Sequence, residues 1–274
     1  MNIHKKLSRL FSSTYSTVLV VIVLLPLMFC VINSFRTTSD LLRGFLVMPQ
    51  ELTIDNYTYL VTERNVFKFM FNSLFVTLSG LLFSFLFNPF IAYMITINWD
   101  KKSYRLLYYI LSSCMFIPSN LLLFPLIKIY YALNLMNVGG LILYYAVIFI
   151  PETVFMLVPY FRTFNKELGN SAKLDGCTTL QMYYRIFLPA CKSFIVTIMI
   201  LNTIWLWNDF LMPLMILNKN PDTWTLPIFI YNFLGRNSFK KNYAFASCQI
   251  ALMPIILFYG VFHKKIISGL NMKK

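Results

Sequence analysis

The chain has little charge and none of the common catalytic motifs. Only 12% of its 274 residues are charged, whereas an average soluble protein has about 25%. The sequence contains no GxxxxGK[ST] phosphate loop, no HExxH motif and no nucleophile elbow. Its two histidines, His4 and His263, have no Cys, Asp or Glu at metal-ligand spacing. We therefore expect no catalytic site, no metal site and no cofactor in this chain.

Cysteines that could form a disulfide framework or a redox motif are also lacking. The count of five is odd and no pair forms CxxC. Most lie in or beside apolar runs, so we expect small apolar fillers or free thiols. They are Cys30, Cys114, Cys177, Cys191 and Cys248.

Long apolar runs dominate what is present, and 58% of the residues are hydrophobic. A helix needs roughly 20 apolar residues to cross a bilayer, and in lipid every backbone polar group must be paired within the chain. We predict an all-α membrane protein in which residues 1–274 form one transmembrane domain of six transmembrane helices. The first run could be a signal peptide, but it is long and lacks a small-x-small cleavage site. The predicted spans are about 14–33, 69–95, 106–130, 139–160, 191–217 and 244–262.

The formal net charge of +14 would suggest a nucleic-acid partner in a soluble protein. In a membrane protein, Lys and Arg collect in cytoplasmic loops. With the N-terminus inside, fifteen Lys and Arg lie in the inner segments and eight in the outer ones. We therefore expect both termini in the cytoplasm and no nucleic-acid partner. The polar insert at about 161–190 would then be cytoplasmic too.

This insert shows signals for two short helices joined by a tight turn. The first would start near Asn165 and stop at Gly176. The second would start at a capping box formed by Thr178 and Gln181 and end at Pro189. The alternative is an ordinary loop against the membrane. An apolar stripe is expected along the second helix at Leu180, Tyr183, Tyr184 and Phe187.

The insert resembles the cytoplasmic signature loop of the inner-membrane permease subunits of ABC importers. That signature reads EAA, three residues, G, nine residues, I, one residue, LP. The spacing is intact, although Asn170 replaces the usual Glu and Ser171 the first Ala. The matching positions are Asn170, Ser171, Ala172, Gly176, Ile186, Leu188 and Pro189, with Asp175 typical of the sugar-importer branch.

Other segments are similar to the carbohydrate branch of this family, whose members include the maltose permease MalG. They include "NSFRTTSDL" with "PQELTIDNYTYL", "FNSLFVTL", "MFIPSNLLLFPL", "WNDFLMPL" and "IISGL". Together they cover nearly the whole chain.

The resemblance implies a set of partners. Two permease subunits, here expected to form a heterodimer, would pair in the membrane. Two ATPase subunits would bind ATP beneath them, and an external solute-binding protein would deliver the sugar. The insert would dock on an ATPase, with Ala172 and Gly176 in its cleft. Lys173 and Asp175 would contact the rim or simply be solvated.

Two acidic residues lie near membrane depth, where such groups usually face protein or a water-filled path. Trp207, Asn208 and Asp209 could line a sugar pathway, because sugars stack on aromatic rings and bond to amides and carboxylates. An interhelical hydrogen bond is the alternative for Asp209, and we favour it. Glu152 follows Pro151 and is expected to be structural.

The resulting hypothesis is a non-enzymatic permease subunit of an ATP-driven importer for a sugar or oligosaccharide, in a bacterial inner or plasma membrane. The same machinery serving another solute, such as a polyamine or a phosphorylated compound, is one alternative. An ion-coupled secondary transporter is the other, and the intact spacing of the insert argues against it.

Overall fold

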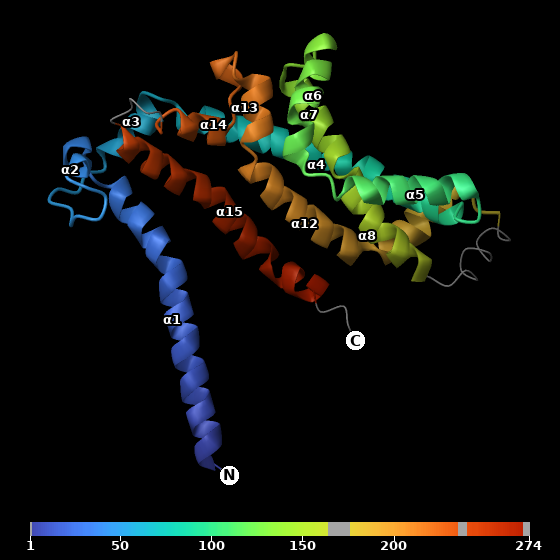
Figure 1. The fold of residues 1–274 in the computed structure, drawn as a ribbon, viewed down its shortest axis with the longest axis horizontal. Helices are drawn as coiled ribbons and strands as arrows, with labels where there is room; N and C mark the ends of the chain where they lie inside the picture. The colour runs from blue at the N-terminus through green and yellow to red at the C-terminus, as the bar shows by residue number, and fades with distance from the viewer. Residues whose placement is uncertain (1, 164–175, 235–239, 271–274) are drawn as a thin grey trace. The chain divides into compact units, whose positions relative to one another are not determined.

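The computed structural model describes residues 2–163, 176–234 and 240–270, which are folded almost entirely into helices (Figure 1). Within these ranges, β-type pairing is limited to an isolated bridge between Arg36 and Leu52. The all-helical prediction is confirmed. Helices suit these apolar segments because each helix pairs its own backbone N–H and C=O groups.

The helices differ widely in length. In chain order they are α1 (Asn2–Ser34), α2 (Thr38–Leu42), α3 (Asp55–Thr62), α4 (Val66–Ile97), α5 (Lys102–Cys114), α6 (Ser119–Ala132), α7 (Val138–Ile148), α8 (Ile150–Thr163), α10 (Thr179–Met182), the π-helix η1 (Tyr183–Phe187), α11 (Leu188–Ala190), α12 (Lys192–Asn208), α13 (Leu211–Leu217), the 3-10 helix η2 (Pro221–Thr223), α14 (Leu226–Tyr231) and α15 (Lys241–Leu270).

Within the part of the chain that the structure describes, four helical segments are long and apolar enough to cross a membrane. A fifth crossing results if the segments Thr179–Ala190 and Lys192–Asn208, which meet at a bend of 76°, count as one span. The four are Ser13–Ser34, Val66–Ile97, Val138–Thr163 and Lys241–Gly260. They match the first, second, fourth and sixth predicted runs.

The third and fifth predicted runs are interrupted. Residues 115–118 separate α5 from α6, and the proline at 118 disfavours helical geometry at the residue before it. Asp209 adopts an extended conformation between α12 and α13. Predicting these runs as continuous helices was therefore wrong, because hydropathy averages over short non-helical breaks.

The chain divides into two compact units, and the first comprises Met1–Lys68 and Phe229–Ile256. Within it the rings of Phe29 on α1 and Phe245 on α15 meet edge to face, with centroids 6.0 Å apart. Asn56 on α3 donates from Nδ2 to the backbone oxygen of Ser34, and its Oδ1 accepts from Asn242. Its amide thus ties α3 to the end of α1 and the start of α15.

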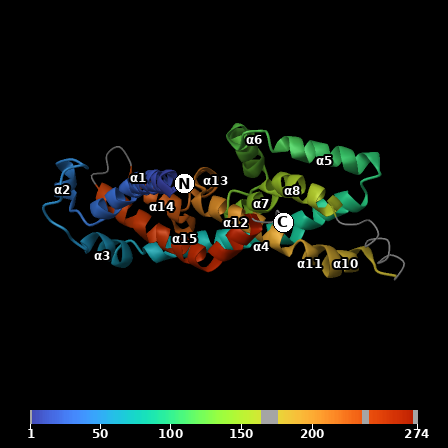
Figure 2. The ribbon, with the colours of Figure 1, turned by 90° about the horizontal axis from the view of Figure 1, so that it is seen from below.

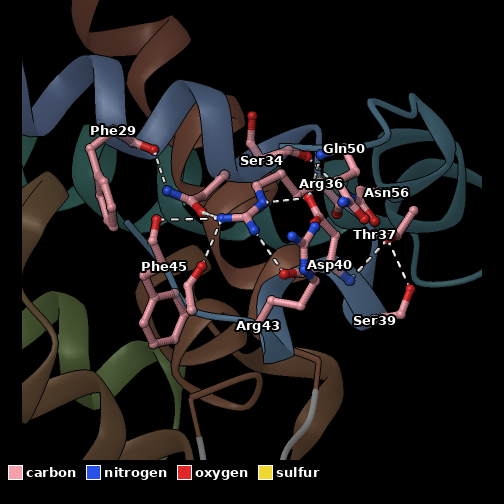
Figure 3. A network of polar contacts seen from close by, with 12 residues as sticks. Phe29, Ser34, Arg36, Thr37, Ser39, Asp40, Arg43, Phe45, Gln50 and Asn56 are labelled. Carbon is pink, nitrogen blue, oxygen red and sulfur yellow. Dashed lines mark hydrogen bonds and ion pairs between the residues drawn. The ribbon is translucent and has the colours of Figure 1, made fainter. Parts of the chain in front are cut away.

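A closed polar network surrounds Arg36, whose side chain is 0% exposed. Its guanidinium donates from Nε to Asp40 Oδ2 at 2.7 Å and from Nη1 to Asn33 Oδ1 and to the backbone oxygen of Gly44, both at 3.0 Å (Figure 3). Asp40 also accepts from Arg43. The hydrogen bond from Arg36 holds the pKa of the Asp40 carboxyl below its ordinary value. These five residues are called the Arg36 network below.

The second unit comprises Phe69–Ile228 and Leu257–Lys274. One hydrophobic cluster joins the C-terminal part of α4 to α8, η1 and the start of α12. Another joins the N-terminal part of α4 to α7 and α13. Gly80 allows the close approach of α7, because a Cβ atom there would lie 2.8 Å from that of Tyr145.

Candidate coupling insert and membrane cavity

The described part of the insert begins at a glycine turn. Gly176 has φ +80°, which favours glycine, and a Cβ atom there would meet no described residue within 4 Å. The conformation agrees with the predicted C-terminal stop. The first predicted helix and part of the signature lie outside the described residues, namely Asn170, Ser171, Ala172, Lys173 and Asp175.

The predicted capping box is present directly after this turn. Thr178 N donates to Gln181 Oε1 at 2.8 Å, and Gln181 N donates to Thr178 Oγ1 at 3.3 Å. These bonds satisfy backbone groups that have no partner within the helix. The second short helix therefore starts where the sequence predicts.

The predicted apolar stripe is only partly correct. Tyr183 is buried, and Phe187 packs against the first hydrophobic cluster, but Leu180 and Tyr184 are exposed. Met182 is buried in their place. Residues 183–187 form a π-helix, which has more residues per turn than an α-helix and so rotates the following side chains away from the expected face.

Five aromatic rings attach the insert to the membrane helices. Tyr183 lies 5.2 Å from Phe90 and 5.3 Å from Tyr93 between ring centroids, and Tyr93 lies 4.8 Å from Phe187. Phe161 on α8 packs edge to face against Phe187 at 5.7 Å. We call these residues the insert aromatic cluster. Each such pair contributes about 0.5–1.5 kcal/mol beyond area burial.

A hydrogen bond strengthens the same attachment. Tyr93 Oη on α4 donates to the backbone oxygen of Thr179 at 3.2 Å, and α10 and α11 lie beside this end of α4 (Figure 2). Ile186 and Leu188, both signature positions, also pack against the first hydrophobic cluster, whereas Pro189 is exposed within α11. The helical segment ends at Ala190, one residue after the predicted end at Pro189, and a bend of 76° separates it from α12.

The residues predicted to line a pathway have different environments. The Asp209 carboxylate accepts a hydrogen bond from Tyr145 Oη on α7 at 2.9 Å, which is the favoured interhelical interaction. Trp207 is buried, whereas Asn208 is exposed and donates to the backbone oxygen of Ile204 one turn earlier. Trp207 and Asp209 line one small cavity together with Tyr145, whereas Asn208 does not contribute to it.

A larger cavity of about 570 Å³ lies beside α12, and it was not predicted from the sequence. Glu152, Asn202 and Trp205 contribute its polar and aromatic lining. Asn202 and Trp205 are three residues apart on one helix and share a face. The signal for this site in the sequence was the carboxylate of Glu152 within an apolar run, which was interpreted as structural.

Comparison with known proteins places these features in a family. Residues 88–271 match the family described as "Binding-protein-dependent transport system inner membrane component". The chain belongs to this family. It is therefore a multi-pass membrane component of a transport system and not an enzyme. The MalG-like resemblance stated from the sequence is confirmed.

The relatives of this transport component are similar over their full length. The chain is 34% identical over 273 residues to the multiple sugar-binding transport system permease protein MsmG of Streptococcus mutans serotype c, covering 99% of this chain and 98% of that one. It is 29% identical to the arabinooligosaccharides transport system permease protein AraQ of Bacillus subtilis, covering 96% and 94%.

The fold of this transport component also has a solved counterpart. A crystal structure of a bacterial ABC transporter involved in the import of the acidic polysaccharide alginate matches with a TM-score of 0.79. The match covers 96% of this chain and 98% of the other at 18% identity. At that identity the similarity establishes the fold only.

Proposed function

We propose that this chain is a permease subunit of an ATP-driven importer that translocates a neutral sugar or oligosaccharide. The observation that carries the proposal is the full-length similarity to a sugar transport permease, at 34% identity over 273 residues. An external binding protein delivers the sugar, and a second permease subunit, different from this one, completes the pathway. The chain crosses the membrane six times and has both termini in the cytoplasm.

The insert couples this permease to its ATPase. The helical segment after the Gly176 turn carries the signature residues Ile186, Leu188 and Pro189, and the insert aromatic cluster connects this segment to α4 and α8. A displacement of the docked insert therefore passes to two long membrane helices through packed rings and not through a flexible linker. Rigid-body movements of this kind underlie switching between alternative states of transporters.

The coupling can be tested at Gly176, because an added side chain there would meet no described residue within 4 Å. Gly176→Ala introduces the strain of a side chain at positive φ without bulk, and Gly176→Arg adds bulk and charge to the same strain. We expect the Ala variant to retain the ATPase subunits during affinity purification and the Arg variant to lose them. Both variants should reach the membrane in equal amounts.

Two outcomes would contradict the coupling role. Retention of the ATPase and normal uptake by the Arg variant would make the insert an ordinary loop. Equal loss of ATPase from both variants would assign the effect to backbone strain alone. Uptake into wild-type proteoliposomes that depends on an ion gradient and not on ATP would instead support a secondary transporter.

Substrate class needs a separate experiment. Proteoliposomes holding the complete transporter with its binding protein would be offered maltotriose, arabinotriose and spermidine. The proposal predicts ATP-dependent uptake of a neutral oligosaccharide and none of the polyamine. Uptake of spermidine alone would keep the ATP-driven machinery and reject the sugar.

A further inference from the structure

The cavity beside α12 is formed where membrane helices are broken. Residues 115–118, between α5 and α6, and Phe149, between α7 and α8, lie on or next to its wall. Non-helical backbone at membrane depth is tolerated where it is buried in protein or lines a water-filled cavity. Binding sites of many transporters are built from such discontinuous helices. The volume of about 570 Å³ falls within the range of roughly 300–1,000 Å³ for small-molecule sites.

Two polar side chains on this wall have no partner among the described residues. The Glu152 carboxylate and the Asn202 amide form neither a hydrogen bond nor an ion pair with any residue that the structure describes. Asn202 is 3% exposed, and a buried amide without a partner is costly. An ionisable side chain within a membrane segment is a functional candidate by default. The pair therefore offers a carboxylate and an amide to a bound molecule.

Trp205 supplies an aromatic surface in the same cavity. Trp205 is 41% exposed, although large aromatic residues are usually well packed inside a protein. Phe149 and Tyr145 contact it at nearly perpendicular angles of 82° and 88°. These contacts fix the orientation of the indole ring. A fixed, partly open aromatic ring can pack against the apolar C–H face of a sugar ring.

The charge of the residues that line the cavity limits which ligands it can bind. Among the described residues that line the cavity there is one carboxylate and no Lys or Arg. A phosphorylated or otherwise anionic solute would meet an unpaired negative charge in a medium of low dielectric constant. A neutral, hydroxyl-rich molecule would donate hydrogen bonds to Glu152 and exchange them with Asn202.

We propose that Glu152, Asn202 and Trp205 form a binding subsite for one ring of a neutral sugar within this subunit. The inference rests on the proposed sugar-importer function and adds where in this chain the sugar is held. Glu152 accepts from sugar hydroxyl groups, Asn202 bonds to a neighbouring hydroxyl or ring oxygen, and Trp205 packs on the face of the ring.

Uptake measurements test the subsite in the complete transporter. Maltotriose and arabinotriose would be the probes, supplied by the binding protein to proteoliposomes that hold ATP. A hydrogen bond to a charged group is worth about a factor of ten, so we expect Glu152→Gln and Trp205→Ala each to lower uptake about tenfold. Trp205→Phe, which keeps an aromatic face, should restore most of the activity. Phe155→Ala is the control, because Phe155 is an exposed aromatic residue on α8 outside the cavity.

ATP hydrolysis stimulated by the loaded binding protein separates this proposal from the importer function. Under the proposal the variants keep this stimulation and transport less sugar per ATP. Normal uptake by Glu152→Gln and Trp205→Ala, with stimulated ATP hydrolysis intact, would overturn the subsite alone. Absence of sugar uptake and of stimulation in the wild type would count against the importer function and the subsite together. An equal loss of uptake in Phe155→Ala would assign the effect to helix packing.

Cys114 offers a direct binding measurement that does not depend on transport. It is an exposed free cysteine and lines the same cavity. With the other four cysteines replaced by Ala, maltotriose or arabinotriose should slow maleimide modification of Cys114 in the absence of ATP. Adding Glu152→Gln should abolish this protection, whereas adding Phe155→Ala should not. Equal modification rates with and without sugar would contradict binding at this site.

Discussion

The Arg36 network and the cavity beside α12 place carboxylates in opposite situations. Asp40 is almost completely buried and accepts from Arg36, Arg43 and the backbone N–H of Gln50. Glu152 is half-buried and has no partner among the described residues. A polar group whose bonds are all satisfied within the chain holds structure together. One whose bonds remain unmade is available to a ligand.

Removing the charged group should lower thermal stability at the Arg36 network but not at the cavity beside α12. This difference in stability is the largest effect we expect. Arg36→Met leaves the acceptors on Asn33 and Gly44 without their donor, and each such group costs about 1–3 kcal/mol where it is buried. Asp40 loses its shortest hydrogen bond and keeps those from Arg43 and Gln50. Glu152→Gln removes a carboxylate with no partner, so thermal stability in detergent should be unchanged or slightly raised. Arg43→Met is the control, because the Arg43 side chain is 42% exposed and exposed ion pairs contribute about 0–1 kcal/mol. Equal melting temperatures for the Arg36 and Arg43 variants would show that the network is not structural.

Acid should open the Arg36 network before it disturbs the rest of the first unit. The pKa of Asp40 is lowered in the folded protein, so its contribution to stability is fully present above the pKa of an unfolded aspartate, roughly 4. It is lost as pH falls through the lower folded value. Limited proteolysis of residues 35–54 should therefore be constant from neutral pH to about pH 5 and accelerate below about pH 4. Asp40→Asn should remove this pH dependence, and an unchanged profile in that variant would assign it to another group.

The capping box predicts a smaller, local effect. Thr178→Ala removes the side-chain acceptor for Gln181 N, and the loss of such a cap costs about 1 kcal/mol. Hydrogen exchange at residues 179–187 should become about five times faster at that cost. Thr197→Ala is a matched control, because the Thr197 hydroxyl donates to the backbone oxygen of Ser193 within α12 and does not cap a helix end. Uniform acceleration across the whole chain would contradict a local role.

The Asp209 carboxylate accepts one side-chain hydrogen bond, from Tyr145, and so lies between the fully bonded Asp40 and the unpartnered Glu152. Removing this bond should change thermal stability least. Tyr145→Phe removes the donor to its carboxylate, and polar interactions between membrane helices average about 0.6 kcal/mol. Tyr144→Phe is the matched control, because its hydroxyl makes no hydrogen bond with a residue that the structure describes. Thermal unfolding should separate the two variants by one or two degrees. A loss of sugar uptake without a change in stability would instead return Asp209 to the pathway.

Features set by short stretches of sequence were predicted well. The helical membrane class, the Gly176 turn and the capping box depend on residues close together in the chain. The interhelical bond of Asp209 followed from the cost of an unpaired carboxylate at membrane depth, although its donor, Tyr145, could not be identified without the fold. These are cases in which local chemistry leaves few alternatives.

The features that were missed depend on contacts between distant segments. The breaks at 115–118 and Asp209 look like ordinary apolar sequence to a hydropathy average. Glu152, Asn202 and Trp205 meet only when α8 and α12 pack together. The exposure of Tyr184 accompanies a π-helix at residues 183–187, which no sequence period of 3.6 residues predicts.

The 76° bend at Cys191 would change the direction of the movement that the proposed coupling transmits. Because α11 and α12 meet at this angle, a push along the axis of the insert becomes a sideways push at the base of α12. The helix rises 1.5 Å per residue, so Trp205 lies about 20 Å from the bend. A rotation of a few degrees about Cys191 would therefore sweep the indole ring by about an ångström. That distance is enough to separate a sugar ring from the surface that holds it.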